Sequence, residues 1–429
     1  MPREIIDLSP PQERAILVGA PLKRGTRKHL VQEHLEELGR LADTAGALVV
    51  GELTQQLDRP DSATYIGSGK LEELNTLIAE RGATLVIFDD ELTPAQGKNL
   101  EQALTKRVID RAELILDIFA IRARSAEAKM QVELAQLEYS LPRLTRLWTH
   151  LEKFRGGIGV RGPGETQLET DRRLVGHRIR LLKDRLAEVA KSREVQRKQR
   201  RSQFRAALVG YTNAGKSSIL KGMSAANDIF IEDRLFATLD PLTREVSLTA
   251  GRGAEVLLTD TVGFIRKLPH DLVASFRATL EETREADILL HVIDASHPTW
   301  EEQRIVVDDV LADLGVHDKP VIHVFNKVDR LSEEEAGAQK ARMDNLLPGS
   351  VFVSAVRPGG LEPLREALLE ARRASRPVAE VRMSPSDGKR LAELHRRAEV
   401  LGQRMDDATG ELVVKVRSPA DLLARLGLM

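Results

Sequence analysis

The 429-residue sequence contains no cysteine, and only 3% of its residues are aromatic. The absence of cysteine excludes disulfides, thiolate metal sites and cysteine nucleophiles. It also fits a reducing compartment, so we expect a cytoplasmic protein. Because aromatic residues are scarce, the hydrophobic cores must consist mainly of Leu, Val, Ile and Ala.

Long hydrophobic runs are also missing. No apolar segment approaches the roughly 20 residues that a membrane helix requires. The N-terminus, MPREIIDLSP, lacks the basic stretch and apolar run of a secretory signal. We therefore expect no integral membrane association.

The formal net charge of −1 hides an uneven distribution of charged residues. Residues 142–205 contain 18 Lys/Arg and 7 Asp/Glu, a formal charge of +11, which leaves −12 for the rest of the chain. Such segregation indicates an anionic partner at the basic segment.

Apolar runs of strand length alternate with helical patterns in two parts of the chain, which predicts two parallel α/β domains. We expect the first at 1–111, the second at 204–375, and a small α+β domain at 378–429. The expected strands are 15–20, 47–50, 84–88, 205–210, 254–259, 287–293, 321–325, 350–353 and 412–416.

Two heptad seams, over 130–151 and 175–189, lie between these α/β domains. Their apolar residues are spaced alternately by four and three, as in helices that pack lengthwise. The glycine-rich segment 154–170 joins them, so we predict an antiparallel helical hairpin at 112–203 with this segment as its tip loop. Pro142 predicts a kink or break in the first helix. Two independent helices joined by a disordered linker are the alternative.

The segment GYTNAGKS, residues 210–217, matches the phosphate-loop pattern G-x-x-x-x-G-K-[ST] after an apolar strand. Its glycines let backbone N–H groups face phosphates at the positive end of a helix. Lys216 would contact the β- and γ-phosphates, and the Ser217 hydroxyl would ligate Mg²⁺. A partial look-alike, Gly67-Ser-Gly69-Lys70, lacks the preceding strand, so we interpret it as a turn before a helix.

Two further motifs follow at the ends of expected strands. In Asp260-Thr-Val-Gly263, Asp260 would hold Mg²⁺ through water and the Gly263 N–H would approach the γ-phosphate. In Asn326-Lys327-Val-Asp329, the Asp329 carboxylate would accept hydrogen bonds from guanine N1–H and its exocyclic amine. Adenine has no N1–H, so this motif predicts selection of GTP over ATP. Asn326 would tie the loop to the phosphate loop, and the Lys327 stem would cover the base.

Two other segments complete the expected site. Ser354-Ala355 ends a strand where a backbone N–H can contact guanine O6. A switch loop is expected between the phosphate loop and the next strand, where a threonine would provide a second Mg²⁺ ligand. Thr238 and Thr243 are both candidates for that ligand.

These motifs, together with GPGETQLETDRR at 162–173, FATLDP and DTVGF, resemble the HflX family of translational GTPases over nearly the whole chain. The resemblance implies a P-loop GTPase domain with an N-terminal α/β domain, a helical hairpin and a small C-terminal α+β domain. It implies a GTP hydrolase that binds the large (50S) ribosomal subunit in a GTP-dependent manner and dissociates stalled or idle 70S ribosomes. We expect the chain to be a monomer. A GTP-switched assembly or quality-control factor without splitting activity is the alternative. The resemblance to the HflX family also favours Thr238 over Thr243 as the second Mg²⁺ ligand.

The resemblance implies catalytic roles for Lys216, Thr238, Asp260 and Gly263, and Mg²⁺ on Ser217 and Thr238. The implied GTP site consists of Gly210, Tyr211, Thr212, Asn213, Ala214, Gly215, Lys216, Ser217, Phe236, Ala237, Thr238, Leu239, Asp240, Asp260, Thr261, Val262, Gly263, Asn326, Lys327, Val328, Asp329, Ser354, Ala355 and Val356.

The residue after Gly263 is Phe264, whereas Ras-like enzymes have a glutamine there that orients the attacking water. We therefore predict slow intrinsic hydrolysis that accelerates when the ribosome orders the switch loops. Asn213 resembles the asparagine that holds K⁺ in some GTPases without that glutamine; a turn residue is the alternative reading.

Basic residues are concentrated around the expected hairpin tip, where glycines would let the loop approach a crowded RNA surface. A solvated helix face is the alternative explanation for such a charge run. The predicted RNA contacts are Lys153, Arg155, Arg161, Arg172 and Arg173, with Arg178, Arg180, Lys183 and Arg185 further along the helix.

Overall fold

A computed structural model describes nine ranges of the chain: residues 12–23, 28–144, 163–198, 203–224, 235–249, 254–268, 282–316, 318–407 and 409–418. The chain divides into two compact units. The first contains 1–189, 234–239 and 267–276, and the second contains 190–233, 240–266 and 277–429. Within the nine described ranges, none of the helices could cross a membrane.

The first unit contains a four-stranded parallel sheet in the order β2-β1-β3-β4. Its core is aliphatic, as the composition predicts, with Ile16, Val86 and Leu100 fully buried. The fourth strand, only four residues long, was not predicted. The strands are β1 (Arg14–Gly19), β2 (Leu48–Thr54), β3 (Leu85–Phe88) and β4 (Arg107–Asp110), and the helices around them are α1 (Lys28–Thr44), α2 (Ser68–Arg81), α3 (Pro94–Leu104) and α4 (Arg111–Arg122).

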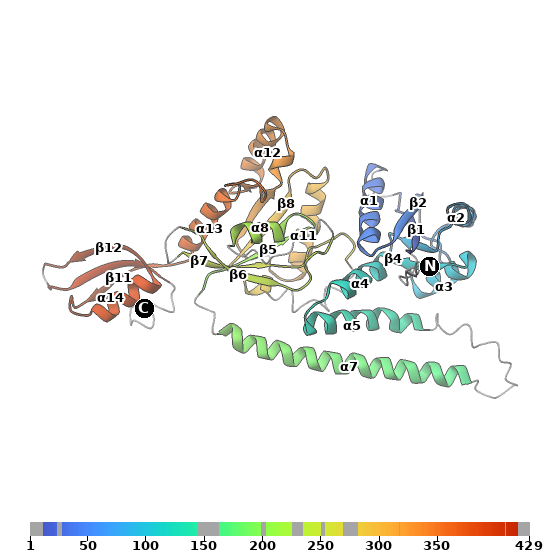
Figure 1. Cartoon of the computed structure of the whole chain (residues 1–429), viewed down its shortest axis with the longest axis horizontal. Coiled ribbons are helices and arrows are strands. Elements are labelled where there is room, and N and C mark those ends of the chain that lie inside the picture. Colours follow the sequence, from blue (N-terminus) through green and yellow to red (C-terminus); the bar gives the residue numbers. More distant parts are fainter. Residues whose placement is uncertain are drawn as a thin grey trace, which may run out of the picture. The chain divides into compact units, whose positions relative to one another are not determined.

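The described parts of the two heptad seams, which end at Leu144 in the first seam, pack against each other. Helix α5 (Ala126–Ser140) buries Leu134 against Ile179 and Leu182 of the long helix α7 (Pro163–Lys198). The predicted break at Pro142 is present, because α5 ends at Ser140 and a short 3₁₀ helix, η1 (Leu141–Arg143), follows. Figure 1 shows α5 and α7 side by side.

The prediction of a tip loop over 154–170 was wrong for its second half. Helix α7 already begins at Pro163, so 163–170 are helical. Proline is favoured at the first helical position because its fixed φ is helical and no backbone N–H is lost there. The rest of the expected tip, with Arg155 and Arg161, and the adjacent Lys153 lie outside the described residues.

Two short segments distant in sequence belong to the first unit: 234–239 and 267–276. The ring of Phe236 packs edge-on against Phe119 of α4, with ring centroids 4.8 Å apart. The Lys267 ammonium lies 2.9 Å from the carboxylate of Asp89 and also pairs with Asp90. Asp89 is itself held by the buried guanidinium of Arg111 at 2.8 Å.

The second unit is built on a six-stranded sheet in the order β10-β9-β8-β5-β7-β6. All neighbouring strands are parallel except β6, which pairs antiparallel with β7 at the edge and was not predicted. The central strand β8 is buried along its whole length, as expected for a strand covered on both faces. The strands are β5 (Arg205–Gly210), β6 (Leu242–Ser247), β7 (Glu255–Asp260), β8 (Ile288–Asp294), β9 (Val321–Asn326) and β10 (Val351–Phe352).

Helices α8 (Lys216–Met223), α11 (Trp300–Asp313), α12 (Glu333–Leu346) and α13 (Glu362–Ala374) accompany this sheet. The C-terminal part of the unit is a three-stranded antiparallel sheet, β11-β13-β12, with helix α14. Val381, Leu394 and Val414 form its small core. Of these three strands, the sequence predicted only β13, as a strand over 412–416. The elements are β11 (Val378–Met383), α14 (Gly388–Arg397), β12 (Glu399–Met405) and β13 (Leu412–Arg417).

Candidate nucleotide-binding site

The segment 210–217 forms a tight loop between β5 and α8. Gly210 has φ +152°, and a Cβ there would lie 2.3 Å from the carbonyl oxygen of Val292. Gly215 has φ +97°, and its Cβ would lie 2.2 Å from Nδ2 of Asn326. Both positions therefore require glycine, because any side chain would collide with a neighbouring strand or loop.

Lys216 is almost fully buried within this loop, with 6% of its surface exposed. Its ammonium donates hydrogen bonds to the carbonyl oxygens of Gly210 at 3.2 Å and Tyr211 at 2.9 Å. Burial lowers the pKa of Lys216 to about 8, although the nearby Asp260 carboxylate opposes that shift. The ammonium is therefore the main form at neutral pH, and it is held at the loop where a phosphate chain would lie.

Ser217 and Asp260 lie side by side at the start of α8 and the end of β7. The Ser217 hydroxyl donates a hydrogen bond of 2.6 Å to Oδ2 of Asp260. A hydroxyl and a carboxylate are the hard oxygen ligands that Mg²⁺ prefers, so this pair fits that ion.

Gly263 lies directly against the phosphate loop. A Cβ at Gly263 would be 2.7 Å from Cα of Thr212 and 3.0 Å from Nζ of Lys216. Only glycine permits this approach, which brings the backbone of the second motif next to the lysine.

Phe264, which replaces the glutamine of Ras-like enzymes, is buried with 1% exposure. Its backbone pairs with the phosphate loop: the N–H donates to Gly210 at 3.1 Å, and the carbonyl accepts from Thr212 at 2.7 Å. The side chain is apolar and enclosed, so it cannot orient a water molecule.

Asn326, at the end of β9, links three loops. Its Nδ2 donates a hydrogen bond of 3.0 Å to the carbonyl of Ala214, and its Oδ1 accepts from the N–H of Ala355 at 3.2 Å. The expected connection between this motif and the phosphate loop is therefore present. Asn326 is 1% exposed, so loss of either bond would leave a buried polar group unsatisfied.

The two residues that should recognise the base are also fixed. Asp329 Oδ1 accepts a hydrogen bond of 2.5 Å from the hydroxyl of Ser354. Lys327 has φ +64°, and its ammonium donates to the carbonyl of Asn213 at 2.8 Å. The same ammonium lies 2.7 Å from Oδ2 of Asp294, a buried carboxylate at the end of β8. No sequence motif indicated this residue.

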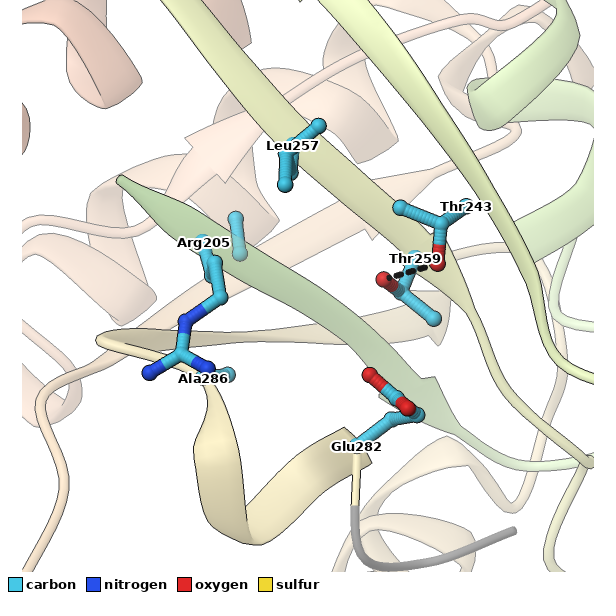
Figure 2. A pocket seen from close by; sticks show the side chains of 7 residues that line it. Arg205, Thr243, Leu257, Thr259, Glu282 and Ala286 are labelled. Carbon is cyan, nitrogen blue, oxygen red and sulfur yellow. Dashed lines mark hydrogen bonds between the residues drawn. The ribbon is translucent and has the colours of Figure 1, made fainter. Parts of the chain in front are cut away.

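The two threonine candidates for a second Mg²⁺ ligand differ in their surroundings. Thr243 lies on β6, and its hydroxyl shares a hydrogen bond of 2.9 Å with Thr259 of β7 (Figure 2). This bond fixes Thr243 within the sheet. Thr238 belongs to the first unit, whereas Ser217 belongs to the second.

The pocket in Figure 2 is separate from these loops. Arg205 and Ala206, which contribute to its lining, begin β5, whereas the phosphate loop follows the other end of that strand. Its volume of about 60 Å³ is far below the roughly 300–1,000 Å³ of typical ligand pockets. We therefore assign no ligand to it.

The look-alike segment at Gly67 has no nucleotide-binding features. Gly67 precedes α2 as its N-cap, and the ammonium of Lys70 pairs with Glu73 at 2.9 Å on the same helix. The prediction of a turn before a helix was wrong for Ser68, Gly69 and Lys70, which already form the first turn of α2.

The basic residues of α7 fall into two groups. Arg178 makes a bidentate pair with Glu133 at 2.6 and 2.9 Å, and Lys183 pairs with Glu138 at 2.8 Å. These two residues link α7 to α5, so the expectation that they contact RNA is weakened. The second group consists of Arg172, Arg173, Arg180 and Arg185, which are exposed and do not belong to these two ion pairs.

Three family models match consecutive parts of the chain. They are described as the GTP-binding GTPase N-terminal region over 32–120, the GTP-binding GTPase middle region over 122–200, and a 50S ribosome-binding GTPase over 205–327. The chain is 50% identical over 364 residues to the GTPase HflX of Caldanaerobacter subterraneus subsp. tengcongensis, covering 84% of this chain and 81% of that protein. It belongs to the HflX family of GTPases.

Two further HflX proteins support this assignment. That of Magnetococcus marinus is 46% identical and covers 96% of this chain and 94% of its own. That of Escherichia coli K12 is 43% identical, with 90% coverage of both. The chain also resembles a solved GTP-binding protein from Sulfolobus solfataricus in complex with GDP, at 23% identity and a TM-score of 0.44, covering 84% of this chain and 98% of that one.

As an HflX GTPase, the chain is a GTP hydrolase, as predicted. P-loop GTPases use Mg²⁺ to neutralise the charge that develops on the phosphates during hydrolysis. The oxygen ligands at Ser217 and Asp260 fit that requirement.

Proposed function

We propose that this HflX GTPase binds the large (50S) ribosomal subunit in its GTP-bound form and dissociates stalled or idle 70S ribosomes. The observation that carries the proposal is the match of residues 205–327 to a family model described as a 50S ribosome-binding GTPase. In the same region, Asn326 joins the phosphate loop to the loop that is proposed to bind guanine. Its relatives carry the name GTPase HflX. Because ribosomes are the target, the proposed site of action is the cytoplasm.

The proposed nucleotide contacts follow the geometry of the second unit. The backbone of 210–217 and the Lys216 ammonium would hold the phosphates, and Asp329 would accept the guanine N1–H and amine. The stem of Lys327 would lie along the base, and the N–H of Ala355 would face O6.

Mg²⁺ would be held by Ser217, with Asp260 beside it. The role of Thr238 as a second ligand is proposed from the FATLDP motif. K⁺ binding at Asn213 stays a proposal as well, because its φ of +60° suits a turn residue equally. Comparing hydrolysis rates in KCl and NaCl decides between these two roles of Asn213.

Among the described residues, the proposed contacts with ribosomal RNA are Arg172, Arg173, Arg180 and Arg185 of α7. Arg172 and Arg173 lie within the GPGETQLETDRR segment, near the start of the helix. A helix carrying exposed guanidinium groups suits binding to phosphates and RNA shape. Lys153, Arg155 and Arg161 are proposed to extend this surface.

A pelleting assay with purified 50S subunits tests the binding proposal. We expect much more chain to pellet with a non-hydrolysable GTP analogue than with GDP. The double variant Arg172→Glu/Arg173→Glu should lower this binding by about tenfold or more and keep GTP affinity. Lys340→Glu/Lys389→Glu, which reverses two exposed lysines elsewhere, is the matched control and should bind normally. Equal pelleting with both nucleotides would contradict the proposal.

Sedimentation of 70S particles separates splitting from the alternative of an assembly or quality-control factor. Splitting predicts conversion of 70S particles to subunits when the chain and the GTP analogue are present. An assembly factor would bind 50S subunits and leave 70S particles intact.

A further inference from the structure

A cluster of metal-binding side chains lies in the second unit, outside the nucleotide loops. His291 of β8, His323 of β9 and Asp308 of α11 each offer one possible ligand atom, and these atoms lie within 4.8 Å of one another. We propose that His291, Asp308 and His323 bind one divalent metal ion of the zinc class.

The fold places the two histidines together. His291 and His323 are register partners on the adjacent parallel strands β8 and β9, so their side chains leave the same face of the sheet. Their rings are 5.6 Å apart and tilted by 39°.

Asp308 approaches the pair from the helix. Its Oδ1 lies 3.3 Å from Nδ1 of His291. That separation is about the distance between two ligands of a tetrahedral zinc ion with bonds of roughly 2.0–2.1 Å.

The buried nitrogen of His291 supplies the second observation. The side chain is 1% exposed, and its Nδ1 has no hydrogen bond of acceptable geometry, although Asp308 is near. Buried nitrogen atoms without a hydrogen bond are rare and costly in folded proteins. A metal ion between Nδ1 and Oδ1 would satisfy both atoms.

Charge and chemistry also fit a metal ion. Burial lowers the pKa of His291 and lowers that of His323 to about 4, so both rings are neutral at pH 7 and have a lone pair to donate. Arg304 holds Oδ2 of Asp308 at 2.5 Å, which leaves Oδ1 directed at His291. A residue that orients a ligand in this way is typical of metal sites.

The site is open enough to load. The side chain of Asp308 is 41% exposed and His323 is half-buried, so two of the three proposed ligands are in contact with solvent. Two imidazoles and one carboxylate leave a fourth position for water, a common ligand set for Zn²⁺. The ion would join β8, β9 and α11.

The test is metal binding by the full chain after removal of any histidine tag. GDP and excess Mg²⁺ are present throughout, so that the nucleotide site does not take up the added metal. Zn²⁺ retained after dialysis is measured by mass spectrometry, and Co²⁺ titration is followed by its visible absorption bands. We expect one tightly held equivalent of Zn²⁺ and the intense bands of a four-coordinate Co²⁺ site.

Two variants at the partly exposed ligands, His323→Asn and Asp308→Asn, should each weaken Zn²⁺ binding by about tenfold or more. His395→Asn is the matched control, because this exposed histidine lies on α14 and contacts Gln403. Zn²⁺ should also raise the Tm of the native chain and of the control, and raise it less in the two variants. GDP binding shows that the variants are folded. No retained Zn²⁺, or equal Zn²⁺ affinity in all four proteins, would overturn the proposal.

Discussion

The side chain of Asn326 donates a hydrogen bond of 3.0 Å to the carbonyl oxygen of Ala214, and this bond joins the proposed base-reading loop to the phosphate loop. The same side chain accepts from the N–H of Ala355. Three loops that come from widely separated parts of the sequence are therefore held in one arrangement by a single buried amide.

Replacing Asn326 with alanine should weaken GDP and GTP binding by about 10- to 100-fold, since both loops lose a buried hydrogen bond. The measurement is fluorescence titration with a labelled guanine nucleotide. Asn345→Ala removes a comparable amide–carbonyl bond, to Ala341 on the exposed helix α12, and serves as the control. Unchanged affinity in Asn326→Ala would show that the loops keep their positions without this link.

Nucleotide affinity should fall as the pH rises above about 8. Burial lowers the pKa of Lys216 to about 8, so the phosphate-binding ammonium predominates below that pH and the neutral amine predominates above it. Bound phosphate would raise this pKa, because negative charge favours the ammonium. Titrations of GDP at pH 6.5, 7.5 and 8.5 are expected to show tighter binding at the two lower values. A flat profile would mean that Lys216 does not titrate in this range.

The hairpin should loosen when its core is truncated. Leu182→Ala removes a fully buried side chain between α5 and α7, which costs about 2–4 kcal/mol at such sites. Faster hydrogen exchange across both helices is the expected result, with GTP affinity unchanged. Leu174→Ala on the same helix is the control, because that leucine is 60% exposed. Equal exchange in both variants would show that the seam contributes little.

The isolated chain should hydrolyse GTP slowly and turn over about tenfold faster or more when ribosomal subunits are added. The physical reason is that the buried, apolar Phe264 cannot position the attacking water. Phosphate release with and without 50S subunits measures the effect. Rapid turnover by the chain alone would show that another group already orients the water.

The sequence alone predicted that the motifs at 210–217, 260–263 and 326–329 lie at the ends of β5, β7 and β9, because each motif is contiguous and follows a buried strand whose apolar pattern is clear. It missed Asp294, since this carboxylate meets Lys327 only through the pairing of β8 with β9. Strand β6 was also missed, because an edge strand with partly exposed residues has no continuous apolar run. At Pro163 the many glycines predicted a loop, yet helix α7 begins there.

The nucleotide preference of the native chain and of an Asp329→Asn variant tests the central claim most directly. The claim is that the Asp329 carboxylate selects guanine while the loop around Lys216 holds the phosphates. Calorimetry should show that the native chain binds GTP at least about 100-fold more tightly than it binds ATP. The Asp329→Asn variant should lose most of this preference. It should also gain affinity for xanthosine triphosphate, whose ring carries an oxygen in place of the guanine amine. ATP binding as tight as GTP, or unchanged GTP binding in Asp329→Asn, would contradict the account.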